Sequence, residues 1–142
     1  MVLNQIMKNH AIWSAILAWA IAQGIKFVIT YWDEKKIDMT KFWSSGGMPS
    51  SHSALVMALS VAVGRSVGFD SPIFAISIMF GMVVMYDAVG VRQAAGKHAK
   101  ALNMILLNSD LHFEEQLKEL LGHTPLQVFA GAVLGIIVGL LY

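Results

Sequence analysis

The sequence predicts an all-α membrane protein, a polytopic transmembrane helix bundle of about four spans plus amphipathic helices. The chain of 142 residues is 56% hydrophobic and has a mean hydropathy of +0.62. Only 13% of its residues are charged, whereas a soluble domain usually has about 25%. Four apolar stretches also qualify as membrane spans, which need roughly 20 mostly apolar residues.

The same composition excludes several other classes of protein. A disordered chain is poor in apolar residues, and this one is rich in them. The sequence has no cysteine, which excludes a disulfide scaffold and a cysteine-based zinc or redox site. The formal net charge is only +1, so there is no basic excess to neutralise nucleic-acid phosphates. We therefore expect membrane lipids, and no nucleic acid, as partners.

The expected spans belong to a single membrane domain over residues 1–142, because this length fits one domain. Glycine and other small residues occur throughout them, as helix packing in lipid prefers. The four spans run from His10 to Tyr31, from Ser53 to Val67, from Pro72 to Val89 and from Pro125 to Tyr142.

Residues 91–121 form a polar amphipathic insertion within this domain. The stretch from Arg92 to Leu121 is too polar for a lipid-facing span, yet its apolar residues recur at helical spacing. We expect one or two amphipathic helices there, at the interface or in a polar cavity. The loops 32–52 and 90–124 share one face and hold most of the lysines and arginines. The positive-inside rule places this face in the cytoplasm of a multi-pass cell-membrane protein, unless the basic residues bind an anionic substrate.

A first motif, Pro49-Ser50-Ser51-His52, leads into the second span. Pro49 favours an extended residue before it, and Ser50 or Ser51 is then a natural N-cap. The free N–H groups and the positive end of such a helix suit a phosphate, and Gly47 lets the backbone approach it. The alternative is a well-capped helix with an interfacial histidine.

A second cluster begins the last span. His123 lies just before Pro125, a favourable first-turn residue, and the amide of Gln127 is spaced to reach the imidazole. Gly131 and Gly135 continue the Gln127 face and permit close helix packing. The alternative is a loop histidine followed by a packing stripe of glycines.

These motifs resemble those of the type 2 phosphatidic acid phosphatase (PAP2) superfamily. Pro49-Ser50-Ser51-His52 is similar to its P-S-G-H motif, and His123 to Gly135 resembles its H-x-P-x-D-V-x-A-G-x-x-x-G ending. Nearly the whole chain is similar to the small divergent PAP2 family, including the stretch from Asp87 through Arg92. The resemblance implies a PAP2-like helical core.

The resemblance also implies a phosphatase that needs no metal or other cofactor. His123 would attack phosphorus and form a phosphohistidine, and His52 would act as general acid and base. Ser50 and the Ser51 amide, with Gly47 beside them, would hold phosphate oxygens.

The chain departs from the superfamily pattern at several positions. Lys26 matches the lysine of the K-x6-R-P motif, but Asp33 and Glu34 replace its R-P. The arginine of the third motif is absent, and Gln127 replaces the orienting aspartate. A glutamine fixes a tautomer but cannot stabilise an imidazolium by charge, and loss of such a carboxylate in a serine protease lowers the rate by about 10⁴.

Asp87 and Arg92 follow as replacements for the missing groups. An acidic residue at the edge of a membrane helix is costly and indicates function, so Asp87 is the candidate carboxylate. Arg92 would be the bidentate phosphate ligand. The alternative is an Asp87–Arg92 or Asp87–Lys97 ion pair that only staples the helix. For Lys26 the alternative is a snorkelling side chain that carries its charge to the interface. Three further residues could line the cavity of the site, or could instead form the solvated face of an amphipathic helix. They are Lys97, His98 and Asn103.

Topology supports a shared site, since two spans separate His52 from His123 and return both to one face. The leading hypothesis is a lipid-phosphate phosphatase. The second is a non-catalytic membrane module that binds or moves an anionic phospholipid. The third is a metal site built from four side chains with no dedicated ligand spacing. The residues of this metal site are His52, Asp87, His98 and His123.

Four short spans bury limited surface, which is compatible with a homo-oligomer.

Overall fold

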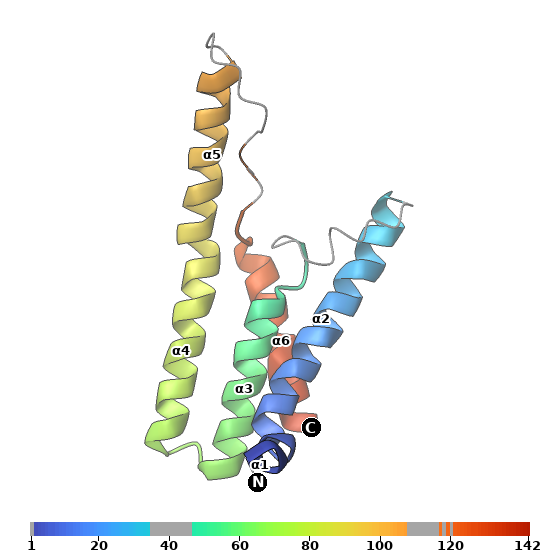
Figure 1. The fold of residues 1–142 in the computed structure, drawn as a ribbon, viewed down its shortest axis with the longest axis vertical. Helices are drawn as coiled ribbons and strands as arrows, with labels where there is room; N and C mark the ends of the chain where they lie inside the picture. Colours follow the sequence, from blue (N-terminus) through green and yellow to red (C-terminus); the bar gives the residue numbers. More distant parts are fainter. Residues whose placement is uncertain (1, 35–46, 108–116, 118, 120) are drawn as a thin grey trace.

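The computed structural model describes residues 2–34, 47–107, 117, 119 and 121–142, and in this part all regular structure is helical. Helices α2, α3 and α6 pack together, and α4 runs along α3 and continues into α5 (Figure 1). The predicted all-α membrane bundle is confirmed. The helices are α1 (Val2–Met7), α2 (His10–Glu34), α3 (Ser51–Val67), α4 (Pro72–Val89), α5 (Val91–Leu107) and α6 (Pro125–Leu141).

The helices begin where local capping chemistry begins them. Ser50, Ser71 and Thr124 have extended backbones, and the side chain of each accepts a hydrogen bond from the N–H three residues later. The expected N-cap at Ser50 is confirmed, and α3 starts at Ser51, two residues before the expected span. Asn9 accepts the N–H groups of two residues in the first turn of α2. The short helix α1 precedes it and was not expected from the sequence.

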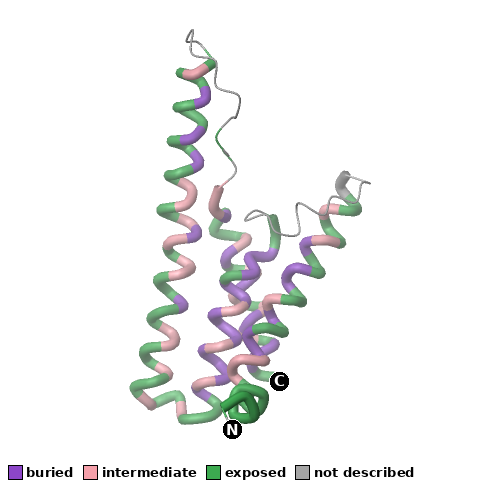
Figure 2. The backbone as a smooth tube through the Cα atoms, viewed as in Figure 1, coloured by how far each residue is buried: buried purple, intermediate pink, exposed green. Residues whose placement is uncertain are grey.

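Two stretches of the described chain have the length and composition to cross a membrane, His10–Trp32 and Pro72–Leu107. Helices α3 and α6 are apolar but have 17 residues each, the lower end of the spanning range of about 17–25. These two helices hold much of the buried surface, whereas α4 exposes most of its apolar side chains (Figure 2). This arrangement suits α4 to face lipid.

Small residues form the centre of the bundle. Four alanines from α2 and α3 are fully buried and meet one valine of α6, with Leu134 packed against them. Small side chains let helix backbones approach closely, which gains dispersion energy where lipid removes the hydrophobic drive to associate. The buried cluster is Ala18, Ala22, Ala54, Ala58 and Val138.

Three glycines of α6 lie directly against α3. A Cβ on Gly131, Gly135 or Gly139 would overlap atoms of α3, among them the carbonyl oxygens of Ser50 and Ala54. The packing interpretation of Gly131 and Gly135 is therefore confirmed. This close contact brings the first turn of α3 beside the first turn of α6, where the peptide N–H of Ser50 donates to the Gln127 carbonyl at 3.0 Å.

We expect Gly131→Ala to destabilise the protein. The added methyl group must push α6 away from the Ser50 carbonyl, and overpacking of this kind costs about 1–3 kcal/mol. Thermal unfolding in detergent measures the loss. Gly24→Ala is the matched control, because a Cβ at Gly24 meets no heavy atom within 4 Å. Equal stability of the two variants would show that the α3–α6 contact is looser than described.

Helices α4 and α5 form one nearly straight rod of 36 residues, interrupted at Gly90 (Figure 1). At 1.5 Å per residue the rod is about 54 Å long, which exceeds the roughly 30 Å hydrocarbon core. Part of it must therefore lie outside the hydrocarbon, and the more polar half is α5. Helix α5 is the first amphipathic helix expected in the insertion.

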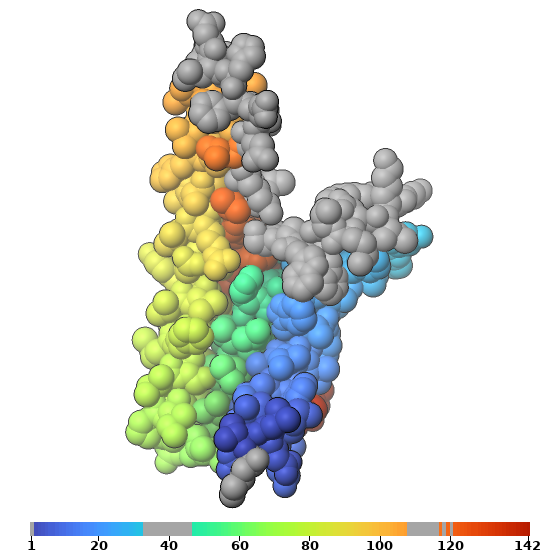
Figure 3. Space-filling model, in the orientation of Figure 1, coloured from blue at the N-terminus to red at the C-terminus, as the bar shows by residue number. Residues whose placement is uncertain are grey.

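A second amphipathic helix is not formed at the described positions after Leu107. Leu117, Glu119 and Leu121 have irregular backbone, and contacts with Asn103 and Gly96 place this segment beside α5. In the space-filling view, α4 and α5 form one long edge of the molecule (Figure 3). The Asn103 side chain accepts the Leu117 N–H at 2.9 Å and donates to the Leu117 carbonyl at 2.8 Å. The Asn103 side chain thus pairs with backbone groups of Leu117 that a helix would pair with its own backbone. Gly96 has no side chain, which lets the carbonyl of Glu119 approach α5. The helical spacing of the leucines was therefore misleading here.

Candidate functional site

The start of α6 fixes the amide of Gln127. Thr124 caps the helix, and its Oγ1 accepts the Gln127 N–H at 3.3 Å. In return the Oε1 atom of Gln127 accepts the Thr124 N–H at 3.0 Å, which completes a capping box. Because a backbone N–H can only donate, this bond identifies the amide atom that faces Thr124 as oxygen and not nitrogen.

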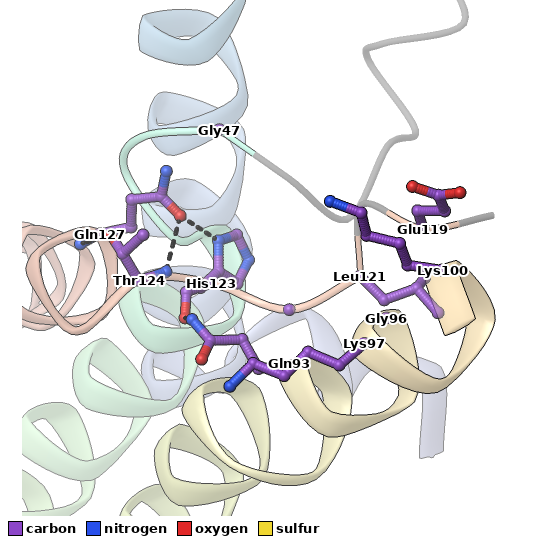
Figure 4. Close-up of a pocket in the computed structure, with 11 residues that line it drawn as sticks. Gly47, Gln93, Gly96, Lys97, Lys100, Glu119, Leu121, His123, Thr124 and Gln127 are labelled. Atoms are coloured by element: carbon purple, nitrogen blue, oxygen red, sulfur yellow. Dashed lines mark hydrogen bonds between the residues drawn. The ribbon is translucent and has the colours of Figure 1, made fainter. Parts of the chain in front are cut away.

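The same oxygen contacts the ring of His123. The Nδ1 atom of His123 lies 3.2 Å from the Oε1 atom of Gln127 (Figure 4). Since this amide oxygen accepts, Nδ1 must carry the proton, and in the neutral ring the Nε2 atom then holds the free lone pair. Gln127 thus selects the tautomer in which Nε2 is a nucleophile.

The backbone around His123 is held by the junction of α4 and α5. The His123 N–H donates to the Ala88 carbonyl at 2.9 Å, and the Gln93 amide donates to the His123 carbonyl at 3.3 Å. Gly122 has a φ of +89°, and a Cβ there would lie 2.7 Å from the Gln93 nitrogen. A glycine is required at this position by both conformation and space. His123 itself is only 2% exposed.

The first motif approaches the same place from α3. Ser50 is fully buried, and its Oγ accepts from the N–H and, at 3.0 Å, the hydroxyl of Ser53. Ser51 is buried and begins the helix, and His52 is exposed on its first turn. The peptide bond from Met48 to Pro49 is cis. The expected phosphate ligand Ser50 therefore has its oxygen engaged in capping, whereas the first N–H groups of α3 have no partner within the helix.

Lys26 reaches the site from α2. Its side chain is 4% exposed and runs past Gly47, where a Cβ would lie 3.2 Å from the Lys26 Cγ atom. Gly47 has a φ of +89°, a conformation that side chains other than glycine rarely adopt. The snorkelling interpretation of Lys26 is wrong, because a snorkelling lysine places its ammonium group in water.

Asp87 and Arg92 form the ion pair that the sequence offered as an alternative. The Arg92 Nε donates to the Asp87 Oδ2 at 2.7 Å, and both side chains are about two-fifths exposed, 42% and 38%. Ion pairs at this exposure contribute about 0–1 kcal/mol to stability. The carboxylate of Asp87 is thus paired with Arg92. The Nδ1 atom of His123, which Asp87 was expected to orient, has Gln127 as its partner instead.

Electrostatics link these groups to the nucleophile candidate. Burial lowers the pKa of His123 below its ordinary value of 6.5, and the Gln127 hydrogen bond opposes this. The positive charges of Lys26, His52 and Arg92 lower the pKa of His123 further. All three act on one ring, so the structure brings both motif histidines and both candidate cations to one end of the bundle.

A cavity of about 460 Å³ opens beside His123. Figure 4 shows His123, Thr124 and Gln127 on one side of it and Lys100 and Glu119 on the other. Its lining comes from the loop before α3, from α5 and from the segment that leads into α6. The lining residues are Gly47, Gln93, Gly96, Lys97, Lys100, Glu119, Leu121, Gly122, His123, Thr124 and Gln127.

Some of the suggested residues lie elsewhere. Lys97 lines the cavity, but His98 is exposed outside the lining and Asn103 is buried against Leu117 and Glu119. Arg65, near the end of α3, donates to the Gly139 and Leu140 carbonyls at the end of α6.

The metal hypothesis gains no geometric support. Within the described residues, no three His, Cys, Asp or Glu side chains are close enough together to hold a metal ion. Several sequence expectations fall outside the described residues. These concern the lysines at 35, 36, 41 and 118, which belong to the basic loops of the expected cytoplasmic face.

The positions of Gln93, Gly96 and Lys100 at the cavity were not expected from the sequence. Their signal was present, because Gln93, Gly96, Lys97 and Lys100 recur at spacings of three and four and so share one face of a helix. The capping role of Thr124 was also missed, although T-x-x-Q is a capping-box pattern. Both signals depend on knowing where the helix begins.

Comparison with known proteins identifies the family of the chain. The pattern of the Divergent PAP2 family matches residues 7–138. A relative named as an uncharacterized membrane protein, YuiD of Bacillus subtilis (strain 168), is 37% identical over 150 residues, which cover 96% of this chain and 95% of the relative. No solved structure matches the chain significantly. A match over nearly the whole sequence, with both motif histidines inside it, shows that the chain belongs to the Divergent PAP2 family.

Proposed function

We propose that the protein is a multi-pass cell-membrane phosphatase that hydrolyses a lipid phosphate through a phosphohistidine on His123, without a metal cofactor. One observation carries the proposal: the capping box of α6 fixes an oxygen on Nδ1 of His123, so that Nε2 holds the lone pair. This is the arrangement that a nucleophilic imidazole needs.

The first step forms the phosphoenzyme. The Nε2 atom of His123 attacks phosphorus while the bond to the lipid oxygen breaks in line. His52 in its protonated form gives its proton to the leaving alkoxide. Lys26, Arg92 and the first N–H groups of α3, that of Ser51 among them, neutralise charge on the transferring phosphoryl group. Ser50 positions this turn through its cap.

The second step releases phosphate. His52, now neutral, takes a proton from a water molecule, whose oxygen attacks phosphorus as the P–N bond breaks. The electron pair returns to Nε2, and His52 regains the proton it needs for the next cycle. A cavity at the end of a membrane bundle suits a substrate with an apolar tail and a phosphate head.

The direct test is release of inorganic phosphate from a panel of lipid phosphates by the purified protein in detergent. We expect release that persists when EDTA is present. Loss of activity with EDTA, restored by a divalent metal, would favour the metal hypothesis instead.

The alternative is a non-catalytic module that binds or moves an anionic phospholipid. Two observations favour it: Gln127 brings no negative charge to His123, and Asp87 occupies the Nε atom of Arg92. Saturable binding of lipid phosphate with no release from any member of the panel would support this alternative and contradict the phosphatase.

Gln127→Glu is expected to raise turnover about 5–10-fold. Glutamate preserves the capping box and the bond to Nδ1, and a charge-assisted hydrogen bond is roughly twice as strong as a neutral one, a gain of about 1–1.5 kcal/mol. The gain is modest because the native glutamine already selects the correct tautomer. Steady-state kinetics measure it, with Gln127→Met as the control that removes the bond and lowers turnover. An unchanged or lower rate for Gln127→Glu would contradict this role.

The titration of His123 provides a separate test. Burial and three positive neighbours lower its pKa, so the ring should stay neutral as the pH falls below 6.5 and gain its proton only at a more acidic pH. Nitrogen NMR of the labelled protein in detergent, with His123→Gln to assign the signal, measures both the midpoint and the tautomer. A midpoint above 6.5, or a neutral ring with its proton on Nε2, would contradict the described site.

A further inference from the structure

The cavity beside His123 is larger than a single phosphate group requires. Its volume of about 460 Å³ lies within the range of about 300–1,000 Å³ that is typical of sites for whole small molecules. His123, Thr124 and Gln127 occupy only one side of it. The rest of the lining therefore surrounds a part of the ligand other than the reacting phosphate.

The far side of the cavity carries positive charge. Lys97 and Lys100 of α5 line it, and in the described part of the chain neither forms an ion pair. Glu119 also lines it, and its Oε1 atom accepts a hydrogen bond from Asn103 at 2.9 Å. Among the described lining residues on this side, two ammonium groups thus accompany one carboxylate, which gives them a net positive charge.

The two lysines are exposed on the surface of α5, and they also line the cavity. They share a helix face with Gln93, whose amide bonds the His123 carbonyl, and with Gly96, which packs against the backbone of Glu119. That face points toward the segment that carries His123 (Figure 4). The lysines therefore line the same cavity as the candidate nucleophile.

The spacing along α5 separates this charge from the reacting phosphate. At 1.5 Å per residue, Lys97 lies about 6 Å and Lys100 about 10 Å along the helix from Gln93, the residue that touches His123. A phosphate at His123 would therefore lie at one end of this span, with the backbone of the two lysines about 6–10 Å further along the helix. A ligand with two anionic groups joined by a short linker would reach both.

We propose that the preferred substrate is a lipid whose headgroup carries a second anionic group, held by Lys97 and Lys100 while the terminal phosphate reacts at His123. This inference rests on the proposed function for its reacting group but names a different set of residues. The two lysines bind the headgroup and take no part in bond breaking.

The test compares two lipids that differ in the second charge. Phosphatidic acid has one phosphate, and phosphatidylglycerol phosphate has a terminal phosphate and an internal phosphodiester. We expect the second lipid to have a roughly 10-fold higher kcat/KM, because the two lysines would bind its second anionic group through charge-assisted hydrogen bonds that water screens in part. The double variant Lys97→Gln, Lys100→Gln should remove this preference and change kcat/KM for phosphatidic acid less than about 2-fold.

Matched variants separate this effect from a general loss of charge. Lys97→Arg with Lys100→Arg should keep the preference, since both positive charges remain. Lys8→Gln removes a lysine outside the cavity and should change neither lipid. An equal loss for both lipids in the double glutamine variant would instead assign the lysines to the membrane surface and overturn the proposal.

The outcomes distinguish this inference from the proposed function. Hydrolysis of both lipids at equal kcat/KM by the native protein would overturn the second-anion site and leave the phosphatase intact. If neither lipid is hydrolysed, the phosphatase fails, and equilibrium binding of the same two lipids in micelles tests the site. Tighter binding of phosphatidylglycerol phosphate that is lost in the double glutamine variant supports the site, and equal binding overturns it.

Discussion

Replacing His123 by alanine should abolish phosphate release from lipid phosphates. The variant lacks the Nε2 atom that attacks phosphorus, and removal of a catalytic nucleophile in other enzymes costs about 10⁴-fold or more. Lys26 and Arg92 remain and still attract the phosphate, so lipid binding should persist. Single-turnover phosphate release and equilibrium binding measured side by side in detergent check both parts of this prediction.

The control for His123→Ala is a measurement that shows the variant still folds. His123 is buried, but its backbone bonds to Ala88 and Gln93 and the capping box of α6 do not need the imidazole. Thermal unfolding should therefore show a folded protein, and His123→Gln, which fills more of the space, provides a second inactive variant. Phosphate release near the native rate from either folded variant would exclude His123 as the nucleophile.

Replacing His52 by glutamine should slow hydrolysis of a lipid phosphate by about 10²–10⁴-fold, the usual contribution of a general acid or base. The loss should depend on the leaving group. An alkoxide needs the proton from His52, whereas p-nitrophenolate leaves without one. Formation of the phosphoenzyme from p-nitrophenyl phosphate should thus be nearly unaffected, and its hydrolysis should become slow.

This dependence separates the two histidines. His123→Ala should fail with both substrates, and His52→Gln should still release p-nitrophenol in a burst. Stopped-flow absorbance measures the burst directly. If His52→Gln loses the burst to the same extent as lipid hydrolysis, the residue holds the phosphate or the fold and does not transfer the proton.

Local chemistry explains which parts of the fold were predictable. Helix starts follow from residues close in sequence, so the starts of α3, α4 and α6 were expected within two residues of Ser51, Pro72 and Pro125. The polar insertion was harder, because an amphipathic pattern does not specify the direction of the helix axis. The leucines near Leu117 have helical spacing, yet the side chain of Asn103 binds the backbone there.

The candidate site was predictable where topology determined it. An even number of spans separates His52 from His123 and returns both to one end, and the order of motifs and spans in the sequence was enough to predict this. Long-range packing decided the rest. Nothing near Lys26 in the sequence indicates that Gly47 covers its side chain, and the spacing of Asp87 and Arg92 permits an ion pair as well as a phosphate clamp. The contacts of Gln93 and Gly122 depend on how α5 meets the start of α6.

Detection of a phosphohistidine is the most direct test of the proposal that His123 is the nucleophile. His52→Gln is mixed with p-nitrophenyl phosphate that carries radiolabelled phosphate, quenched in alkali after milliseconds to seconds, and digested to peptides. We expect an alkali-stable, acid-labile label on the peptide that contains His123, at close to one phosphate per chain. Phosphate release without label on His123, or a label on another residue, would contradict it.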